Sequence, residues 1–269
     1  AIFLIIMLFC LNLPAVQTES GSYEDQLVFH LVETYAKGEV VWLGADGNPF
    51  LGLLRQAHEG GAGRVAIILH SMGGHADWPE IIAPLRTGLP TEGWATLSIQ
   101  LPVLSPRDPI ARYGETLDQS ETRIRSAVRY LRERGYSDLV LIGYSFGATS
   151  AVNYLAKNNA DIRAFAGISM QRHAFLSPTY NLIEELEKVT VPILDVYADQ
   201  DFSEVVVSAD VRRLAANKNG HKAYHQLVIE DADHYFSGQQ DTLLAQVAKW
   251  LGSIVPDEMP VDTEPRYFL

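Results

Sequence analysis

The chain has 269 residues, of which 47% are hydrophobic and 20% charged, so wholesale disorder is excluded and one large domain or two small ones can form. Its formal net charge is −12, and no long run of Lys or Arg is present. This balance argues against nucleic acid and against anionic membrane surfaces as partners, but it does not identify a substrate.

The first residues differ from the rest of the chain. Residues 1–13 (AIFLIIMLFCLNL) are apolar and uncharged, and Pro14, Ala15 and a polar segment follow. A membrane span needs about 20 apolar residues, so this shorter run predicts a signal peptide over residues 1–20, cleaved near Ala15. Because an initiator Met and a basic n-region are missing, we expect this leader to be N-terminally incomplete. The alternative is a buried or membrane-anchoring helix.

The single cysteine, Cys10, lies inside this leader. The remaining chain therefore has no means of forming disulfides, thiolate metal sites or a thiol nucleophile. We predict export to a bacterial periplasm or to the outside of the cell. No stable membrane span is expected after the leader is removed, whereas an uncleaved leader would anchor the protein in the membrane.

Short apolar runs alternate with helical patterns in the rest of the sequence. Asp46-Gly47 supplies turn chemistry between two apolar runs, which predicts a hairpin. RVAIIL is typical of a strand buried on both faces of a parallel sheet. The expected strands are residues 40–44, 50–55, 64–69, 94–99, 139–142, 164–168, 193–197 and 224–229.

The helical patterns fall between these strands, at residues 117–134, 148–156, 182–189, 205–216 and 242–251. Strands that alternate with helices predict an α/β fold with a mostly parallel, doubly wound sheet. No internal repeat or low-complexity linker is present, so we predict one domain over residues 21–255. Residues 256–269 contain several prolines and are predicted to form an extended tail.

The motif at residues 143–147, Gly-Tyr-Ser-Phe-Gly, matches G-x-S-x-G. A strand-like run precedes it and a helix-like run follows it, as a nucleophile elbow requires. The turn is so tight that both outer positions need glycine, and the N–H groups at the helix start point at a developing oxyanion. We predict Ser145 as nucleophile. The alternative is a structural turn with a capping serine.

A second serine, Ser71, follows a strand in the motif His-Ser-Met-Gly-Gly at residues 70–74. Leu69 stands where an elbow needs glycine, and the motif follows the third expected strand rather than the fifth. We therefore reject Ser71 as nucleophile. The same loop is expected to supply the second oxyanion-hole donor, so the N–H groups of Met72 and Phe146 are predicted to act together.

The general base and the acid are expected later in the chain, in the order serine, acid, histidine. His234 directly follows the last expected strand and is the predicted base. Asp195 lies within a strand and is expected to point into a packed layer, whereas Asp199 and Asp201 lie in the loop after that strand. Aligning the strand end with the common hydrolase pattern favours Asp201 as the acid, with Asp199 as the alternative.

With these residues in place, the chain resembles the α/β-hydrolase superfamily from about Val40 to Leu251. LHSMGGHADWPE and GWATLSIQLPV also resemble segments of a group of exported proteobacterial hydrolase-like proteins of unassigned function. The resemblance implies a core of eight strands and cleavage of esters, thioesters or amides through an acyl-enzyme. One departure is that His70-Ser71 stands where hydrolases often carry His-Gly, which reduces the backbone freedom of the oxyanion loop.

Lids of lipases are usually inserted between the sixth and seventh strands, and residues 169–190 offer room for only one helix there. Its apolar face is expected to pack on the protein, leaving a small cap and an open pocket. His75, Trp78 and Tyr144 are the candidate substrate-binding residues. No metal-ligand cluster or phosphate-binding glycine motif is present in the sequence, so no metal or cofactor is predicted.

The leading hypothesis is a serine hydrolase that cleaves a carboxylic ester or thioester of a small-molecule substrate. A serine peptidase or amidase on the same residues is one alternative. A non-catalytic envelope binding protein with a hydrolase fold is another, because a fold does not establish a function. Mere binding does not require a serine, an acid and a histidine together, which disfavours the last hypothesis.

Overall fold

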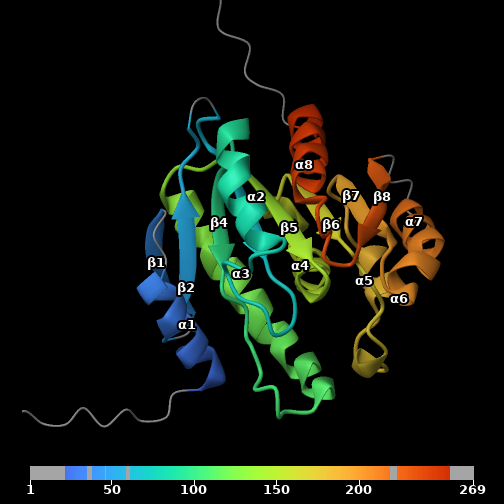
Figure 1. Cartoon of the computed structure of the whole chain (residues 1–269), viewed down its shortest axis with the longest axis horizontal. Helices are drawn as coiled ribbons and strands as arrows, with labels where there is room; N and C mark the ends of the chain where they lie inside the picture. Colours follow the sequence, from blue (N-terminus) through green and yellow to red (C-terminus); the bar gives the residue numbers. More distant parts are fainter. Residues whose placement is uncertain (1–21, 35–37, 46, 59–60, 219–222, 255–269) are drawn as a thin grey trace, which may run out of the picture.

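The computed structural model describes residues 22–34, 38–45, 47–58, 61–218 and 223–254 (Figure 1). The predicted leader and the predicted C-terminal tail lie outside the described residues. The described residues form one sheet of eight strands. The strands are β1 (Glu39–Ala45), β2 (Asn48–Arg55), β3 (Arg64–Leu69), β4 (Ala95–Ile99), β5 (Asp138–Tyr144), β6 (Ala164–Ile168), β7 (Ile193–Gln200) and β8 (Tyr224–Asp233).

The strand order across the sheet is β1-β2-β4-β3-β5-β6-β7-β8. β2 pairs antiparallel with both of its neighbours, and the pairs from β4 to β8 are parallel. The predicted hairpin is the β1–β2 pair, in which Ala45 faces Asn48. The prediction of a mostly parallel, doubly wound α/β sheet is confirmed.

Helices cover both faces of the sheet (Figure 1). α2 and α8 pack on one face, while α3, α4, α5 and α7 lie on the other, and α1 packs beside β2. The α-helices are α1 (Tyr23–Thr34), α2 (Ile82–Gly88), α3 (Leu117–Glu133), α4 (Phe146–Leu155), α5 (Leu182–Leu186), α6 (Ser203–Val207), α7 (Ala209–Asn217) and α8 (Gln240–Ile254). Short 3-10 turns are η1 (Leu89–Glu92), η2 (Ile110–Thr116), η3 (Asn159–Asp161) and η4 (Ala174–Leu176).

The sequence patterns did not predict α1 and α2. α2 spans only seven residues and has Pro84 in its first turn, so it carries little periodic signal. In α1, Leu31 packs against Leu51 and Leu53 of β2. That contact joins residues far apart in the sequence, so tertiary packing supplies most of the stability of such a short helix.

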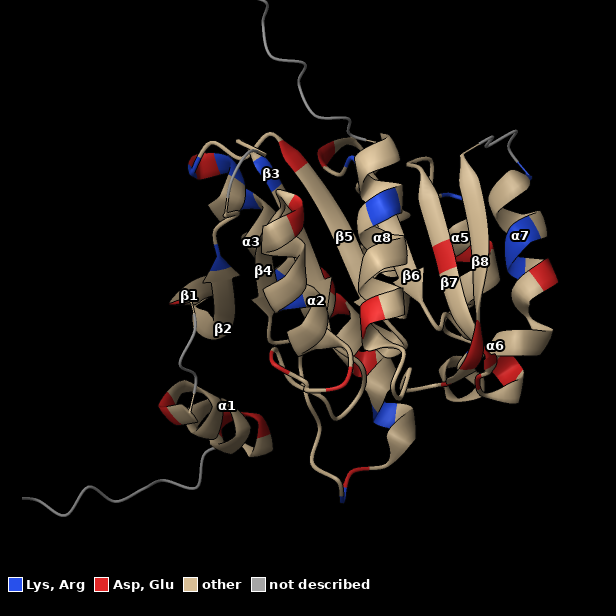
Figure 2. Ribbon diagram, turned by 45° about the horizontal axis from the view of Figure 1, so that its top comes forward, with Lys and Arg blue, Asp and Glu red and all other residues tan. Residues whose placement is uncertain are grey.

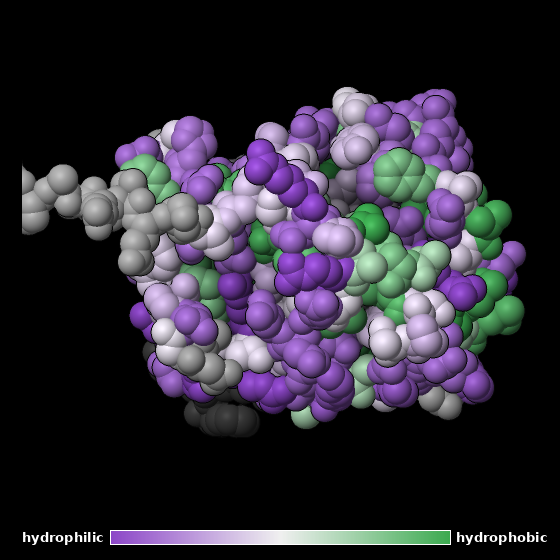
Figure 3. Space-filling view, turned by 90° about the horizontal axis from the view of Figure 1, so that it is seen from below, coloured by the Kyte–Doolittle hydropathy of each residue, from purple (hydrophilic) through white to green (hydrophobic). Residues whose placement is uncertain are grey.

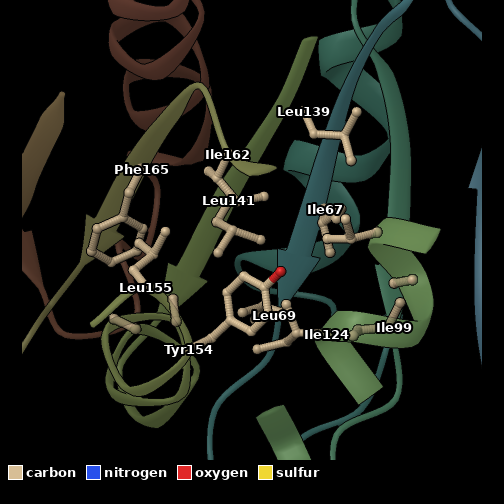
Figure 4. Close-up of a cluster of buried hydrophobic side chains, with 14 of the residues drawn as sticks. Ile67, Leu69, Ile99, Ile124, Leu139, Leu141, Tyr154, Leu155, Ile162 and Phe165 are labelled. Carbon is tan, nitrogen blue, oxygen red and sulfur yellow. The ribbon is translucent and has the colours of Figure 1, made fainter. Parts of the chain in front are cut away.

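The continuous apolar run of β3 is explained by burial on both sides. Ile67 and Leu69 face the core under α3 and α4, where Ile124 and Leu141 also pack (Figure 4). Ile68 faces the second core, under α2 and α8. A strand buried on both faces has no solvent side, so it lacks the alternation of a half-exposed strand.

The helix predicted over residues 205–216 is divided into α6 and α7 at Ser208. The Ser208 hydroxyl donates to the Glu204 carbonyl at 2.5 Å, which satisfies an acceptor in the short helix α6. Arg212 then donates to the Val205 carbonyl and to the Ser208 hydroxyl, each at 2.7 Å. Side chains that bond to the backbone compete with a continuous helix in this way.

A buried ion pair fastens α7 to the sheet. Arg212 Nε donates to Asp195 Oδ2 at 2.8 Å, and both side chains have 0% exposure. Tyr224 and Gln226 of β8 donate to the same carboxylate oxygen. Asp195 thus lies in a packed layer, as expected. The sequence did not reveal that Arg212 is its ion-pair partner.

Acidic and basic positions are distributed over the helices on both sides of the sheet (Figure 2). Within the described ranges, no helix has the length and apolar character needed to cross a membrane.

Replacing Arg212 by Met should lower the free energy of unfolding by about 3–5 kcal/mol, because Asp195 would stay buried without its cation. Urea unfolding followed by circular dichroism measures the change. Arg213→Met is the matched control, since the neighbouring Arg213 pairs with Asp210 at the surface, where solvent screens the interaction and its loss should change the free energy of unfolding little. Equal losses in the two variants would contradict the prediction.

Candidate active site

Ser145 occupies a strained turn between β5 and α4, with φ 52° and ψ −114°. Such a backbone costs on the order of 1–3 kcal/mol in a non-glycine residue and persists only where the surroundings impose it. A Cβ on Gly143 would lie 2.6 Å from Ala148 Cα, and one on Gly147 would lie 2.6 Å from the His70 carbonyl oxygen. Both glycines of the motif are therefore required by close backbone approach.

The turn is connected to the strands on either side of β5. The Ser145 N–H donates to the Ile168 carbonyl of β6 at 2.8 Å. On the other side, Gly147 lies against the carbonyl groups of Leu69 and His70 at the end of β3. The Ser145 backbone is thereby positioned by the carboxyl ends of neighbouring parallel strands, where ligand sites of open α/β sheets occur.

His234 and Asp201 form a buried pair beside this turn. His234 Nδ1 lies 2.6 Å from Asp201 Oδ1, and the two residues are 5% and 9% exposed. Asp201 follows β7 and His234 follows β8, so two adjacent strand ends bring them together. With the Nδ1 proton donated to the carboxylate, Nε2 of His234 is left as the acceptor.

The Asp201 carboxylate accepts further hydrogen bonds. The Ser169 hydroxyl donates to Oδ2 at 2.6 Å, and the Phe202 N–H donates to Oδ1 at 2.8 Å. Burial opposes ionisation of this carboxyl, but the hydrogen bonds from His234 and Ser169 outweigh it and hold the pKa of Asp201 below its usual value. Asp201 is consequently an ionised acceptor that orients the imidazole.

Asp199, the alternative acid, has a different position. Its Oδ1 accepts the Ala232 N–H at 3.1 Å, and the side chain lies near the surface. Hydrogen bonds from the backbone, first that of Ala232, lower the pKa of Asp199. The structure thus brings Asp201, and not Asp199, against His234.

Aromatic rings surround the His234 imidazole. The Phe202 ring stacks on it at a centroid distance of 4.0 Å, and the Tyr144 ring lies 5.3 Å away. The Tyr144 hydroxyl donates to the His234 carbonyl at 3.2 Å. Tyr144 was predicted to bind substrate, but it is only 2% exposed and its hydroxyl is used in supporting the His234 loop. We therefore correct that assignment to a supporting role.

The two residues next to Ser145 in the sequence each pack against a histidine ring. Tyr144 packs against His234, and Phe146 packs against His173, with ring centroids 5.4 Å apart. In the described part of the chain, no hydrogen bond joins Ser145 Oγ to the His234 ring. Such bonds are often long in unliganded enzymes and shorten when substrate binds.

Met72 and Phe146, the two predicted oxyanion donors, belong to the same part of the structure. The Met72 side chain packs on an apolar cluster that contains Phe146 and Tyr113. The Tyr113 hydroxyl accepts the N–H of Gly73 at 3.1 Å and so holds the loop that follows β3. Among the described residues, neither the Met72 nor the Phe146 N–H donates to a protein acceptor.

The His70 side chain holds this loop in place through hydrogen bonds. The Leu101 N–H donates to its Nε2 at 2.9 Å, so Nδ1 carries the proton and donates to the Ser71 carbonyl at 2.7 Å. Complete burial lowers the pKa of His70 to about 3 and keeps the ring neutral. The loop after β3 is thus tied to the loop after β4 by a histidine that does not titrate near neutral pH.

The rejected nucleophile Ser71 lies in this loop, half-buried and not at an elbow. His75 and Trp78 form an edge-on pair with centroids 5.3 Å apart, farther along the same loop. A cavity of 670 Å³ lies beside the candidate site, and neither His75 nor Trp78 lines it. Their role in substrate binding therefore stays a prediction. Within the described ranges, no three His, Cys, Asp or Glu side chains are grouped so as to hold a metal ion.

The segment between β6 and β7 forms a small cap that contains η4 and α5. Leu182, Leu186 and Val189 are buried in the core, which confirms that this apolar face packs on the protein. A cavity of 670 Å³ opens beside the cap and is lined by His173. Neither His173 nor Ser169 belongs to a sequence motif, and their position just after β6 is the single signal that the sequence offers for them.

Comparison with protein families gives a match over residues 14–121 and 104–253 to "Protein of unknown function (DUF3530)". The chain belongs to this family. A comparison with curated proteins gives no match.

Solved structures share the fold. Est1E from Butyrivibrio proteoclasticus aligns with a TM-score of 0.67 and 18% identity, over 81% of this chain and 99% of that one. XC6422 from Xanthomonas campestris, described as an α/β serine hydrolase without lid, has a TM-score of 0.63 and 15% identity over 83% and 98%. The Pyrococcus furiosus esterase Pf2001 has a TM-score of 0.64 and 16% identity over 83% and 93%. The chain therefore has the α/β-hydrolase fold.

The neutral state of His70 predicts a pH-dependent stability. Its folded pKa of about 3 lies below the unfolded value of 6.5, so only the unfolded chain gains a proton as the pH falls through this window. Stability should fall by about 2 kcal/mol between pH 7 and pH 5 from His70 alone. Urea unfolding at the two pH values measures this. His70→Gln should remove this share of the dependence and leave the share of His173, whose pKa is also lowered by burial, whereas exposed His58→Gln should leave the dependence as it is. Equal stability of the wild type at both pH values would contradict the prediction.

Proposed function

We propose that this protein is a serine hydrolase that cleaves a small-molecule carboxylic ester or thioester through an acyl-enzyme. The single observation that carries the proposal is the buried His234–Asp201 pair, at 2.6 Å, beside a serine held in a strained elbow. The coarser assignment to hydrolases is supported by the fold and by its similarity to esterases. The triad and the ester substrate are our proposal.

In the proposed reaction, Ser145 Oγ attacks the carbonyl carbon while its proton passes to His234 Nε2. Asp201 stabilises the resulting imidazolium and holds the ring in place. The carbonyl oxygen becomes an oxyanion that accepts hydrogen bonds from the N–H groups of Phe146 and Met72. Collapse of this intermediate breaks the ester bond, and His234 gives its proton to the departing alcohol or thiol.

Water completes the cycle. It attacks the acyl-enzyme carbonyl carbon and gives one proton to His234. The bond from the acyl carbon to Ser145 Oγ then breaks, and His234 returns the proton to Ser145 Oγ as the acid product leaves. The N–H groups of Phe146 and Met72 stabilise the oxyanion in both halves of the reaction. No metal or cofactor enters the proposed reaction.

Replacing Ser145 by Ala should abolish labelling by a fluorophosphonate and lower turnover of 4-nitrophenyl butyrate by about 10⁴-fold or more, because the nucleophile is lost. Gel fluorescence and 4-nitrophenolate release measure the two effects. Ser71→Ala is the control and should keep both signals. Asp201→Asn should lower turnover by about 10³-fold or more, whereas the matched Asp199→Asn should leave it unchanged.

The outcomes separate the alternative functions. Labelling with turnover of peptide amides but not of esters would assign a peptidase or amidase. A folded wild type that is neither labelled nor active would favour a non-catalytic binding protein. Loss of labelling in Ser71→Ala but not in Ser145→Ala would contradict the elbow assignment.

We also propose that the protein is exported to the periplasm or the cell exterior, on the basis of the apolar segment 1–13, which lies outside the described residues. This would agree with the suggested likeness to exported proteobacterial hydrolase-like proteins. Expression of the natural precursor in a bacterium, followed by fractionation and N-terminal sequencing, should give a periplasmic or secreted chain that begins near residue 16. An uncleaved chain in the membrane fraction would show an anchor, and a cytoplasmic chain would contradict export.

A further inference from the structure

A cavity of 670 Å³ lies between the cap and the two short helices α6 and α7. From the cap it is lined by His173, Leu176 and Tyr180, and from the helices by Val207 and Val211. Its volume lies within the range of about 300–1,000 Å³ that is typical of small-molecule sites. We call it the side cavity.

The inner end of the side cavity adjoins the candidate catalytic residues. The His173 ring packs against the ring of Phe146, the residue that follows Ser145. Thr149 lines the cavity from α4, one turn after Phe146. Burial, and then the proximity of His234, lowers the pKa of His173 to about 4, so its imidazole is neutral at pH 7.

Two polar atoms at this end, His173 Nε2 and Thr149 Oγ1, make no hydrogen bond within the described part of the molecule, and both are buried. The two residues are 9% and 1% exposed. Since buried polar atoms are nearly always hydrogen-bonded, an unpaired neutral imidazole and hydroxyl beside a cavity indicate a place for a ligand that can both donate and accept.

The outer wall has a different character. Val207 and Val211 of α6 and α7 are 75% and 45% exposed, and Val206 and Leu214 extend the apolar surface along these helices. In the space-filling view, green apolar atoms gather on the side where Figure 1 places α6 and α7 (Figure 3). A ligand that leaves the cavity along this wall would bury apolar surface that is otherwise exposed to water.

The charges around the cavity restrict the ligand further. Glu184, Glu185 and Glu204 belong to its lining, and Arg172 is the single cation among the described residues that line it. This excess of carboxylates opposes an anionic ligand. A neutral molecule with an apolar body therefore fits the cavity best.

We propose that the side cavity binds one arm of the ester, and that this arm is uncharged, apolar along its length and hydroxylated where it passes His173 and Thr149. A hydroxyl group can donate to an imidazole nitrogen and can accept from a threonine hydroxyl, so it matches the chemistry of either unpaired atom. The inference rests on the proposed esterase function and specifies its substrate class.

The apolar part is tested with 4-nitrophenyl acetate, butyrate, hexanoate and octanoate, and in parallel with the ethyl, hexyl and octyl esters of acetic acid. In the wild type, kcat/KM should rise by about tenfold or more along one of the series, because methylenes become buried. Val211→Trp narrows the cavity from its outer wall and should reduce this rise. The matched variant Leu214→Trp lies on the same helix outside the cavity lining and should keep it. The series that responds identifies the acyl or the alcohol arm.

The hydroxyl is tested with 4-nitrophenyl 3-hydroxybutyrate against 4-nitrophenyl butyrate, and with 2-hydroxyhexyl against hexyl acetate. The wild type should favour the hydroxylated member of the responding pair by about 3- to 10-fold in kcat/KM. Thr149→Val and His173→Phe preserve size and ring packing, so each should reduce the preference towards unity, and the preference is taken as the ratio of the two esters within each variant.

The failure of this inference is distinguishable from the failure of the proposed function. If Ser145 is labelled and esters are cleaved, but chain length, Val211→Trp and the hydroxyl group have no effect, then the side cavity is not the substrate site and the hydrolase proposal stands. A chain-length effect without any hydroxyl preference would overturn the assigned chemistry of the inner end. Absence of both labelling and turnover would reject the hydrolase and this inference together.

Discussion

The close approach of backbone at the Ser145 turn is the constraint on which the rest of the site depends. Gly143 and Gly147 let α4 begin directly beside the ends of β5 and β3, where a Cβ would overlap backbone atoms. The same contact that strains Ser145 also brings the loop after β3 close to the first N–H groups of α4. One steric requirement thus positions both the candidate nucleophile and the candidate oxyanion donors.

The other half of the site depends on holding β7 and β8 in register beyond their last paired residues. Asp201 and His234 come from the loops after these strands, and their 2.6 Å contact needs both loops in place. The buried Asp195–Arg212 pair joins β7, β8 and α7 a short distance back along the strands. The buried ion pair between Asp195 and Arg212 therefore helps to hold the strands whose following loops carry Asp201 and His234.

Burial disfavours the charged form of each ionisable group in this region, and the partners of the group decide whether it is charged. Asp201 stays charged because an imidazole, a hydroxyl and a backbone N–H donate to it. His70 and His173 stay neutral because desolvation is the dominant influence on each ring. His70 satisfies both ring nitrogens within the protein, whereas His173 leaves Nε2 without a partner among the described residues, beside a cavity. That difference separates a histidine that supports a loop from one that can meet a ligand.

Local patterns in the sequence determined most of the strands, the elbow glycines and the position of His234, because steric limits and periodicity act between neighbouring residues. They left Asp199 and Asp201 unresolved, since a loop between a strand and a helix has no periodicity. The tertiary structure brings Asp201 against His234, places the Tyr144 hydroxyl on the His234 carbonyl, and reveals Ser169, Arg212 and the side cavity. Each of these depends on contacts between segments far apart in the chain, which no local pattern encodes.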